Sequence, residues 1–243
     1  MIKTWSMDDF DSEIFGIKVA KVDPSVFADQ SVSEAENTIK TTVNEFSKNK
    51  IEYATFRLAQ GNYPLIHALE DAGFRLVDEM IDFEVSIDNV SYSVDPHIRK
   101  ATFSDLKGLK KVANESWQLT RFFNDSFLPR DKSKLLYEIW IENSLKGKVA
   151  DVVFIWQESG SICGYITLKK DGHIPLVAVL PGHQGKGISR KMVQAVLNEC
   201  KNLGIVKSYI ETQVANISAI RSYQSCGFKP ISTSLTLRWR RIK

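Results

Sequence analysis

A glycine-rich loop over 184–189, Gln-Gly-Lys-Gly-Ile-Ser, carries the residues whose types and spacing point most clearly to chemistry. It follows an apolar run over 176–180, which is too short for a helix and reads as a buried strand. After the loop, apolar residues recur at helical spacing as far as Gly204. Glycines let the backbone curl without a Cβ in the way. The free N–H groups of a new helix favour an anion, so this segment predicts a phosphate-binding site.

Two common phosphate-binding loops do not fit the segment. A Walker loop needs Ser or Thr after Gly-Lys, where this chain has Gly187. The dinucleotide fingerprint needs Gly-x-Gly-x-x-Gly in an opening βαβ unit. Gly182, Gly185 and Gly187 have another spacing and lie far along the chain. The loop therefore predicts a phosphate-bearing ligand other than ATP or a dinucleotide.

The elements that must position the loop lie in the second part of the chain. We expect an N-terminal α/β lobe over 1–90 that shapes the substrate site, a polar linker over 91–97 and a catalytic domain over 98–243. In that domain we expect three antiparallel strands over 149–156, 160–169 and 172–180. They are followed by the long helix, a strand over 207–212, a helix over 216–226 and a final strand over 229–238.

The first part of the chain has a smaller set of periodic segments. We expect strands over 17–22, 51–58 and 74–87, with helices over 33–46 and 64–72. The run Leu69–Phe74 resembles Tyr223–Phe228, and an apolar strand follows each. The first lobe is therefore interpreted as a reduced copy of the C-terminal half of the second domain, without a glycine loop. A common helix-to-strand turn would give the same pattern.

Composition and charge exclude several classes of protein. The chain has 243 residues with 43% hydrophobic and 25% charged, values typical of a globular protein with a full core. Its net charge of +3 argues against a dedicated nucleic-acid partner. No apolar run is long enough for a membrane span, and we do not expect the N-terminal segment, which has no apolar core, to be a signal peptide. Cys163, Cys200 and Cys226 have no metal-ligand spacing, so we expect buried thiols, no metal and a cytoplasmic location.

The glycine loop resembles the pyrophosphate loop of the GNAT superfamily of acyl-CoA N-acyltransferases. Gln184, Gly187 and Ser189 occupy the places of that family's Gln/Arg-x-x-Gly-x-Gly/Ala pattern, with Ser189 as a small departure. Ala101-Thr102, followed by Asp105-Leu106 and a helix, is a second similarity. The resemblance implies an α+β fold with a central, mostly antiparallel sheet that splays in a V and is flanked by helices. The N-terminal lobe is then a degenerate half of the same fold.

The same resemblance implies that acetyl-CoA is the acyl donor and assigns roles to residues. Backbone groups of the strand before the loop would hold the pantetheine, and the loop would hold the pyrophosphate. The cofactor-binding residues so implied are Val177, Ala178, Val179, Gln184, Gly185, Lys186, Gly187, Ile188, Ser189 and Asn216. Tyr223 matches the tyrosine that protonates the leaving thiolate. A general base is left open among Glu211, His173, Asp151 and Glu158, because water could also take the proton.

The acceptor is implied by a narrower resemblance to GNAT enzymes that acetylate nucleotide-linked amino sugars. It covers Asp11–Gly16 and the segment from Arg121 to Gly147, with Trp140-Ile-Glu-Asn143 as its most specific part. It implies transfer to the 4-amino group of a dTDP-linked 4-amino-4,6-dideoxysugar. Arg121, Phe122 and Trp140 are the acceptor-binding residues in this interpretation, and a surface loop packed on the core would suit the first two equally well.

Two other functions fit the same residues. One keeps acetyl-CoA but changes the acceptor to a polyamine, an amino acid, an antibiotic or a protein N-terminus. The other is a non-catalytic sensor that binds CoA, against which Tyr223 and the intact loop count. The sequence also leaves open whether the protein is a homodimer.

Overall fold

The computed structural model describes residues 3–88, 91–117 and 119–241, which fall into two compact units. The first unit contains Met1–Met80, Asn124–Lys132 and Thr233–Lys243, and the second contains Ile81–Phe123 and Ser133–Ser232. Each unit has its own hydrophobic cluster. The units interleave along the chain, whereas the predicted domains follow one another. The domain boundaries at 90 and 98 therefore stay a prediction. The two compact units divide the chain at other positions.

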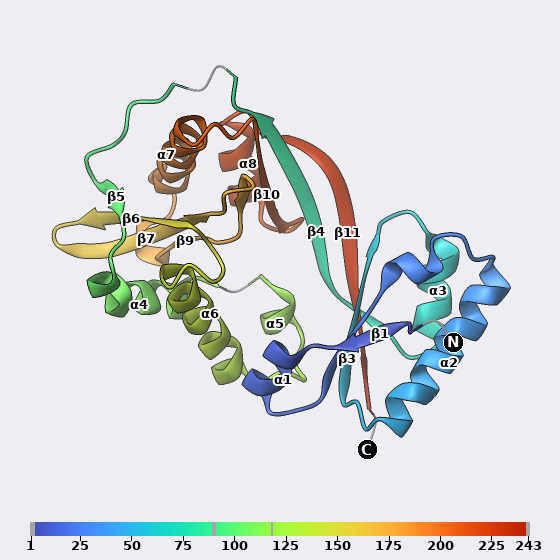
Figure 1. The fold of residues 1–243 in the computed structure, drawn as a ribbon. Helices are drawn as coiled ribbons and strands as arrows, with labels where there is room; N and C mark the ends of the chain where they lie inside the picture. The colour runs from blue at the N-terminus through green and yellow to red at the C-terminus, as the bar shows by residue number, and fades with distance from the viewer. Residues whose placement is uncertain (1–2, 89–90, 118, 242–243) are drawn as a thin grey trace. The chain divides into compact units, whose positions relative to one another are not determined.

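The elements up to residue 88 follow the predicted order (Figure 1). They are β1 (Trp5–Met7), α1 (Asp9–Phe15), β2 (Val19–Val22), the 3₁₀ turn η1 (Pro24–Phe27), α2 (Val32–Lys48), β3 (Tyr53–Ala59), α3 (Tyr63–Asp71) and β4 (Arg75–Ser86). Helix α2 begins at a capping box in which Ser31 and Glu34 satisfy each other's backbone N–H groups. The acidic opening of the chain, for which no element was predicted, contains β1 and α1, and Asp8 caps that helix.

From residue 98 on, the elements match the expected types except at residues 121–124 and at the predicted strand over 172–180. They are β5 (Ile98–Lys100), η2 (Phe103–Asp105), α4 (Leu106–Ser116), α5 (Arg121–Asn124), α6 (Arg130–Leu145), β6 (Val152–Glu158), β7 (Ser161–Leu168), β8 (His173–Ile174), β9 (Val177–Val179), η3 (Pro181–His183), α7 (Ile188–Asn202), β10 (Lys207–Gln213), α8 (Ile217–Gln224) and β11 (Lys229–Arg240). The aromatic and polar residues over 121–130 predict a loop, whereas the structure has the short helix α5 within it.

The strands form mixed, mostly antiparallel sheets, which confirms the predicted fold class. One sheet has the order β1-β2-β3-β11-β4-β10-β8, and the other has the order β5-β6-β7-β9. The pairs β2–β3 and β8–β10 are parallel. The pairs β1–β2, β3–β11, β5–β6, β6–β7 and β7–β9 are antiparallel. No helix among the described residues is both long and apolar enough to cross a membrane.

The predicted strand over 172–180 is wrong as a single strand, because it divides between the two sheets. His173 and Ile174 pair with β10, whereas Val177–Val179 pair with β7. Pro175 lies at the division and has no N–H group to continue a ladder. The next N–H, that of Leu176, donates instead to the Thr167 hydroxyl at 3.0 Å. The chain therefore changes sheets just before the glycine loop.

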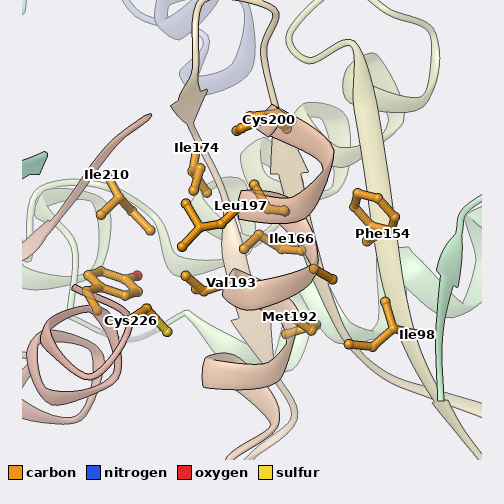
Figure 2. Packing of buried hydrophobic residues seen from close by; sticks show 14 of the residues in the cluster. Ile98, Phe154, Ile166, Ile174, Met192, Val193, Leu197, Cys200, Ile210 and Cys226 are labelled. Atoms are coloured by element: carbon orange, nitrogen blue, oxygen red, sulfur yellow. The ribbon is translucent and has the colours of Figure 1, made fainter. Parts of the chain in front are cut away.

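Helix α7 anchors the loop to the core of the second unit. Its buried face carries Met192, Val193, Leu197 and Cys200, each fully enclosed. Figure 2 shows these side chains among Ile166, Ile174 and Ile210 from the strands. Burying a side chain of this size stabilises the folded state by roughly 1.5–3 kcal/mol. The start of α7, and with it the loop, is thereby held at a fixed place on the sheet.

Helices α3 and α8 end in the same way. Gly73 and Gly227 have φ angles of +89° and +91°, and a buried phenylalanine follows each. The N–H of Phe74 donates to the Leu69 carbonyl at 2.9 Å, and the N–H of Phe228 donates to the Tyr223 carbonyl at 3.2 Å. A parallel strand pair with an intervening helix precedes each of these helices, and a long strand follows each. The structure thus supports interpreting the first lobe as a reduced copy.

Candidate active site

The glycine loop has the backbone conformation that its sequence predicts. Gly185 and Gly187 both have φ angles of +76°, in the left-handed region that favours glycine. A Cβ at either position would meet nothing within 4 Å, so the loop surface is open at these residues. Gly187 is the N-cap of α7 and provides no side-chain cap. The first N–H groups of α7 have no acceptor within the helix and can donate to an anion there.

Two polar side chains tie the loop to neighbouring elements. Gln184 donates from Nε2 to the Val179 carbonyl at 3.0 Å, which joins the loop to β9. Ser189 Oγ accepts from Ser222 Oγ at 3.1 Å, which joins the start of α7 to α8. Ile188 is buried in the core, so only its backbone can face a ligand, whereas Lys186 is exposed. Ser189 is small enough to fit where α7 and α8 approach each other.

Strand β9 offers an edge of backbone groups. It pairs with β7 through Val177, Ala178 and Val179, and it stands last in the order of its sheet. A strand at the end of a sheet has N–H and C=O groups on one side that no other strand uses. Apart from the Val179 carbonyl, which accepts from Gln184, these groups can bind an extended ligand that carries amides.

A cleft of about 340 Å³ brings most of the predicted residues together. Its volume lies within the range of small-molecule sites. Its lining residues come from the end of α4 and the segment after it, from β9, from the loop, and from β10 and α8. They are Ser116, Trp117, Leu119, Thr120, Val177, Ala178, Val179, Pro181, Gln184, Ser189, Gln213, Asn216, Ser218, Ala219 and Tyr223. The predicted Gly185, Lys186, Gly187 and Ile188 belong to the adjoining loop and are not among them.

Tyr223 is enclosed in the core and lines the cleft. Only 4% of the residue is exposed, and its ring packs edge-on against Phe83 at 6.1 Å between centroids. Burial raises the pKa of its hydroxyl well above the ordinary value of about 10, because the charged form would lose hydration. The hydroxyl therefore stays protonated at neutral pH, as a proton donor must.

Asn216 has a structural role at the N-terminus of α8. It is the N-cap of that helix, and its Oδ1 accepts from the Ala219 N–H at 3.2 Å. Its Nδ2 donates to Thr212 Oγ1 at 3.1 Å. The side chain also lines the cleft. A cofactor contact from Asn216 stays a prediction, and the cap is what the structure itself displays.

The predicted acceptor residues lie in an aromatic cluster instead of the cleft wall. Phe122 is buried, and its ring packs edge-on against Trp140 at 5.9 Å. The Arg121 guanidinium lies over the Phe122 ring at 3.9 Å from the centroid. None of these three residues is among the described residues that line the cleft. Their role toward the acceptor stays a prediction, and the packing favours a structural one.

The candidate bases do not line the cleft. Glu211, His173, Asp151 and Glu158 are not among the described lining residues, which include no acidic residue and no histidine. His173 is half-buried, and desolvation lowers its pKa. Glu158 pairs with His183 of the loop, at 3.2 Å from Oε2 to Nδ1. The structure thus favours none of the four.

Folding brings together three side chains whose atoms could bind a metal ion, although their spacing in the sequence does not indicate a metal site. Single atoms of Glu158, Cys163 and His183 lie within 4.8 Å of one another. Cys163 is a free, buried thiol, and desolvation raises its pKa. The Glu158–His183 pair accounts for two of these groups without an ion.

Sequence reasoning missed the residues at and after the end of α4. Ser116, Trp117 and Thr120 line the cleft, together with Leu119. Their only sequence signal is their place at and just after the end of a predicted helix. No residue type there indicates chemistry by itself.

A strand with an open edge, a glycine loop and a buried tyrosine lie beside one cleft, an arrangement that fits the site expected of a GNAT-type acetyltransferase. The acetyltransferase (GNAT) family matches residues 115–228, which hold the whole cleft, and this part of the chain belongs to that family. The protein is therefore an enzyme that transfers an acetyl group.

Curated relatives at moderate identity include enzymes of sugar metabolism. The dTDP-fucosamine acetyltransferase of Escherichia coli O6:H1 is 29% identical over 186 residues, which cover 74% of this chain and 79% of the relative. A spore coat polysaccharide biosynthesis protein of Bacillus subtilis is 29% identical over 51% of this chain, which spans 44% of that protein. N-alpha-acetyltransferase 30 of Schizosaccharomyces pombe is 30% identical over 31% of this chain and 55% of its own length.

Solved structures share the fold across nearly the whole chain. A GCN5-related N-acetyltransferase from Sphaerobacter thermophilus has a TM-score of 0.64 at 14% identity and covers 92% of this chain and 72% of its own. A tandem GNAT protein from the clavulanic acid biosynthesis pathway has a TM-score of 0.56 at 11% identity, with coverage of 91% and 75%. The shared fold thus includes the first lobe as well as the matched family segment.

Proposed function

We propose that the protein transfers the acetyl group of acetyl-CoA to the 4-amino group of a nucleotide-linked 4-amino-4,6-dideoxysugar, with dTDP as the nucleotide. The observation that carries the donor half is the cleft, where the β9 edge, the loop and Tyr223 meet. The acceptor half is supported by the Escherichia coli relative, whose match extends over most of both chains.

The residues of the cleft suit the two ends of an acyl-CoA. The open surface at Gly185 and Gly187 and the free N–H groups of α7 suit a pyrophosphate. The backbone edge of Val177–Val179 suits the pantetheine amides. Acetyl-CoA supplies an activated thioester, and transfer breaks its C–S bond while a C–N bond forms. Tyr223 would hold the proton that the departing thiolate takes up.

The neutral lining of the cleft bears on how the amine loses its proton. With no carboxylate or imidazole among the described lining residues, the proposed route is through water. An acceptor amine of modest pKa suits this route, since a useful fraction of it is already neutral at pH 7. The thiols Cys163, Cys200 and Cys226 are free, which supports a reducing compartment, and we place the reaction in the cytoplasm.

The test is a thiol-release assay with the full chain, acetyl-CoA and a panel of acceptors. The panel contains dTDP- and UDP-linked 4-amino and 3-amino sugars, spermidine, free amino acids and a short peptide with a free N-terminus. We expect turnover with a 4-amino sugar and little with the charged amines. Turnover with the peptide or spermidine alone would replace the proposed acceptor. Binding of acetyl-CoA without thiol release from any amine would indicate a sensor.

A further inference from the structure

Ser116 holds a hydroxyl that the fold leaves unsatisfied. It is the last residue of α4 and lines the cleft. Its Oγ is buried from solvent and has no hydrogen-bond partner within the part of the chain that the structure describes. Buried hydroxyl groups are nearly always paired, because an unpaired one costs folding free energy. An orphaned hydroxyl in a cleft wall therefore points to a partner that arrives with a ligand.

The residues beside Ser116 are, in contrast, firmly held. Trp117 donates from Nε1 to the Tyr165 hydroxyl at 3.2 Å, and its ring stacks on Tyr137 at 4.4 Å between centroids. The Tyr137 hydroxyl donates to Thr120 Oγ1 at 2.9 Å. Trp117 and Thr120 thus have partners from the protein itself. Ser116 Oγ, in contrast, has no such partner among the described residues.

The cleft is also free of charge. None of the described residues that line it is Asp, Glu, Lys, Arg or His. A second charge near the reacting amine would lose hydration there without a counter-charge. A neutral ring that carries hydroxyl groups loses less, since each hydroxyl can pair with a hydroxyl of the wall. The wall therefore suits a sugar better than a polyamine or a peptide.

We propose that Ser116 Oγ forms a hydrogen bond with a ring hydroxyl of the acceptor sugar and so determines its specificity, with the Trp117 side chain beside the ring. The inference rests on the proposed function, because it specifies how the same cleft selects its acceptor. It assigns Ser116 to binding and orientation, and no covalent step passes through it.

The test compares Ser116→Ala and Ser116→Thr in the full chain. In Ser116→Ala we expect kcat/KM for the amino sugar to fall roughly tenfold, the loss that corresponds to one hydrogen bond. The KM for acetyl-CoA should not change, and Ser116→Thr should recover most of the loss. The Tm of Ser116→Ala should equal or exceed that of the wild type, since the removed hydroxyl has no partner in the protein.

A matched control is Ser208→Ala, which removes a buried hydroxyl that donates to the Gly172 carbonyl at 2.7 Å. This variant should lose Tm and keep its KM for the acceptor. A second arm uses amino sugars that each lack one ring hydroxyl. With the analogue that lacks the bonded hydroxyl, wild type and Ser116→Ala should have the same kcat/KM.

Two results would overturn the proposal about Ser116. One is a kcat/KM for the sugar that Ser116→Ala leaves unchanged. The other is a loss of Tm together with a raised KM for acetyl-CoA, which would make Ser116 a structural residue. Failure of the proposed function looks different, because the wild type itself would then release no thiol with any amino sugar.

Discussion

Asn62 and Asn216 are equivalent residues in the two halves of the chain. Asn62 caps α3 with φ and ψ of −84° and 70°, and Asn216 caps α8 with −86° and 65°. Each Oδ1 accepts from the N–H three residues later at 3.2 Å. Only Asn216 lines the cleft, since Asn62 is not among the lining residues that the structure describes. Comparing the two residues therefore distinguishes the structural role of Asn216 as a cap from any role in ligand binding.

The first prediction uses this pair. Asn62→Ala and Asn216→Ala should each destabilise the fold by about 1 kcal/mol, because each removes an N-cap. If Asn216 also contacts acetyl-CoA, only Asn216→Ala raises the KM for acetyl-CoA. Chemical denaturation and steady-state kinetics measure the two effects. Equal KM values in both variants would reduce Asn216 to a cap.

The second prediction concerns the proton donor. Tyr223→Phe should lower turnover by roughly a hundredfold or more, the usual contribution of a general acid, and leave acetyl-CoA affinity near the wild-type value. The ring keeps its packing against Phe83. Because burial raises the pKa of the hydroxyl, activity should show no loss from its ionisation as pH approaches 10. Tyr209→Phe, at the partly exposed Tyr209, is the control; wild-type turnover in Tyr223→Phe would refute the assignment.

The third prediction tests the loop. Gly187→Glu should abolish acetyl-CoA binding, because it places a carboxylate at the N-terminus of α7. Gly160→Glu is a matched control, since Gly160 has a φ of +78° against +76° and equally open space around its Cβ. Both changes should cost a similar 1–2 kcal/mol of backbone strain, roughly. Calorimetry with acetyl-CoA distinguishes them, and tight binding by Gly187→Glu would remove the phosphate role from the loop.

The fourth prediction concerns acid stability. Asp105 accepts from both Nη atoms of Arg99, at 2.7 and 2.8 Å, and the Arg99 guanidinium lowers the pKa of Asp105 to about 2. Its ordinary pKa is near 3.9. A lowered folded-state pKa means stability that is present above about pH 4 and is lost as pH falls toward 2. Asp105→Asn should therefore lower the free energy of unfolding at pH 7 by about 1–2 kcal/mol, which a lower Tm would reveal.

The difference in Tm between wild type and Asp105→Asn should shrink as pH is lowered from 4 to 2. Arg99→Gln should behave in the same way, because it removes the other half of the pair. A difference that stays constant across this range would mean that the ion pair does not stabilise the fold.

Local sequence patterns were enough to predict the glycine loop and the helix that follows it. The glycine spacing and the periodic face of α7 lie within a few residues of each other, and both are local properties of the chain. The same is true of α3 and α8, whose caps and terminal glycines are adjacent in sequence. Long periodic segments with caps carry their own structural information.

Pairing across the chain was harder to predict. Pro175 was a usable signal for the division between β8 and β9, but the partner of each piece lies elsewhere in the chain. Likewise, β11 pairs with β3, with Thr236 opposite Arg57 and Leu237 opposite Phe56, and tertiary packing sets this register. Ser116 was missed because an unsatisfied hydroxyl exists only once the surroundings are built.

Strands β4 and β11 each begin in one compact unit and end in the other. Phe83 on β4 packs against Tyr223, and Trp239 on β11 belongs to the cluster of the first unit. Neither unit therefore consists of one continuous segment of the chain. A recombination or deletion at the linker would separate Phe83 from Tyr223 and the first lobe from β11, its last strand. We therefore expect the loss of either half to disturb the fold of the other.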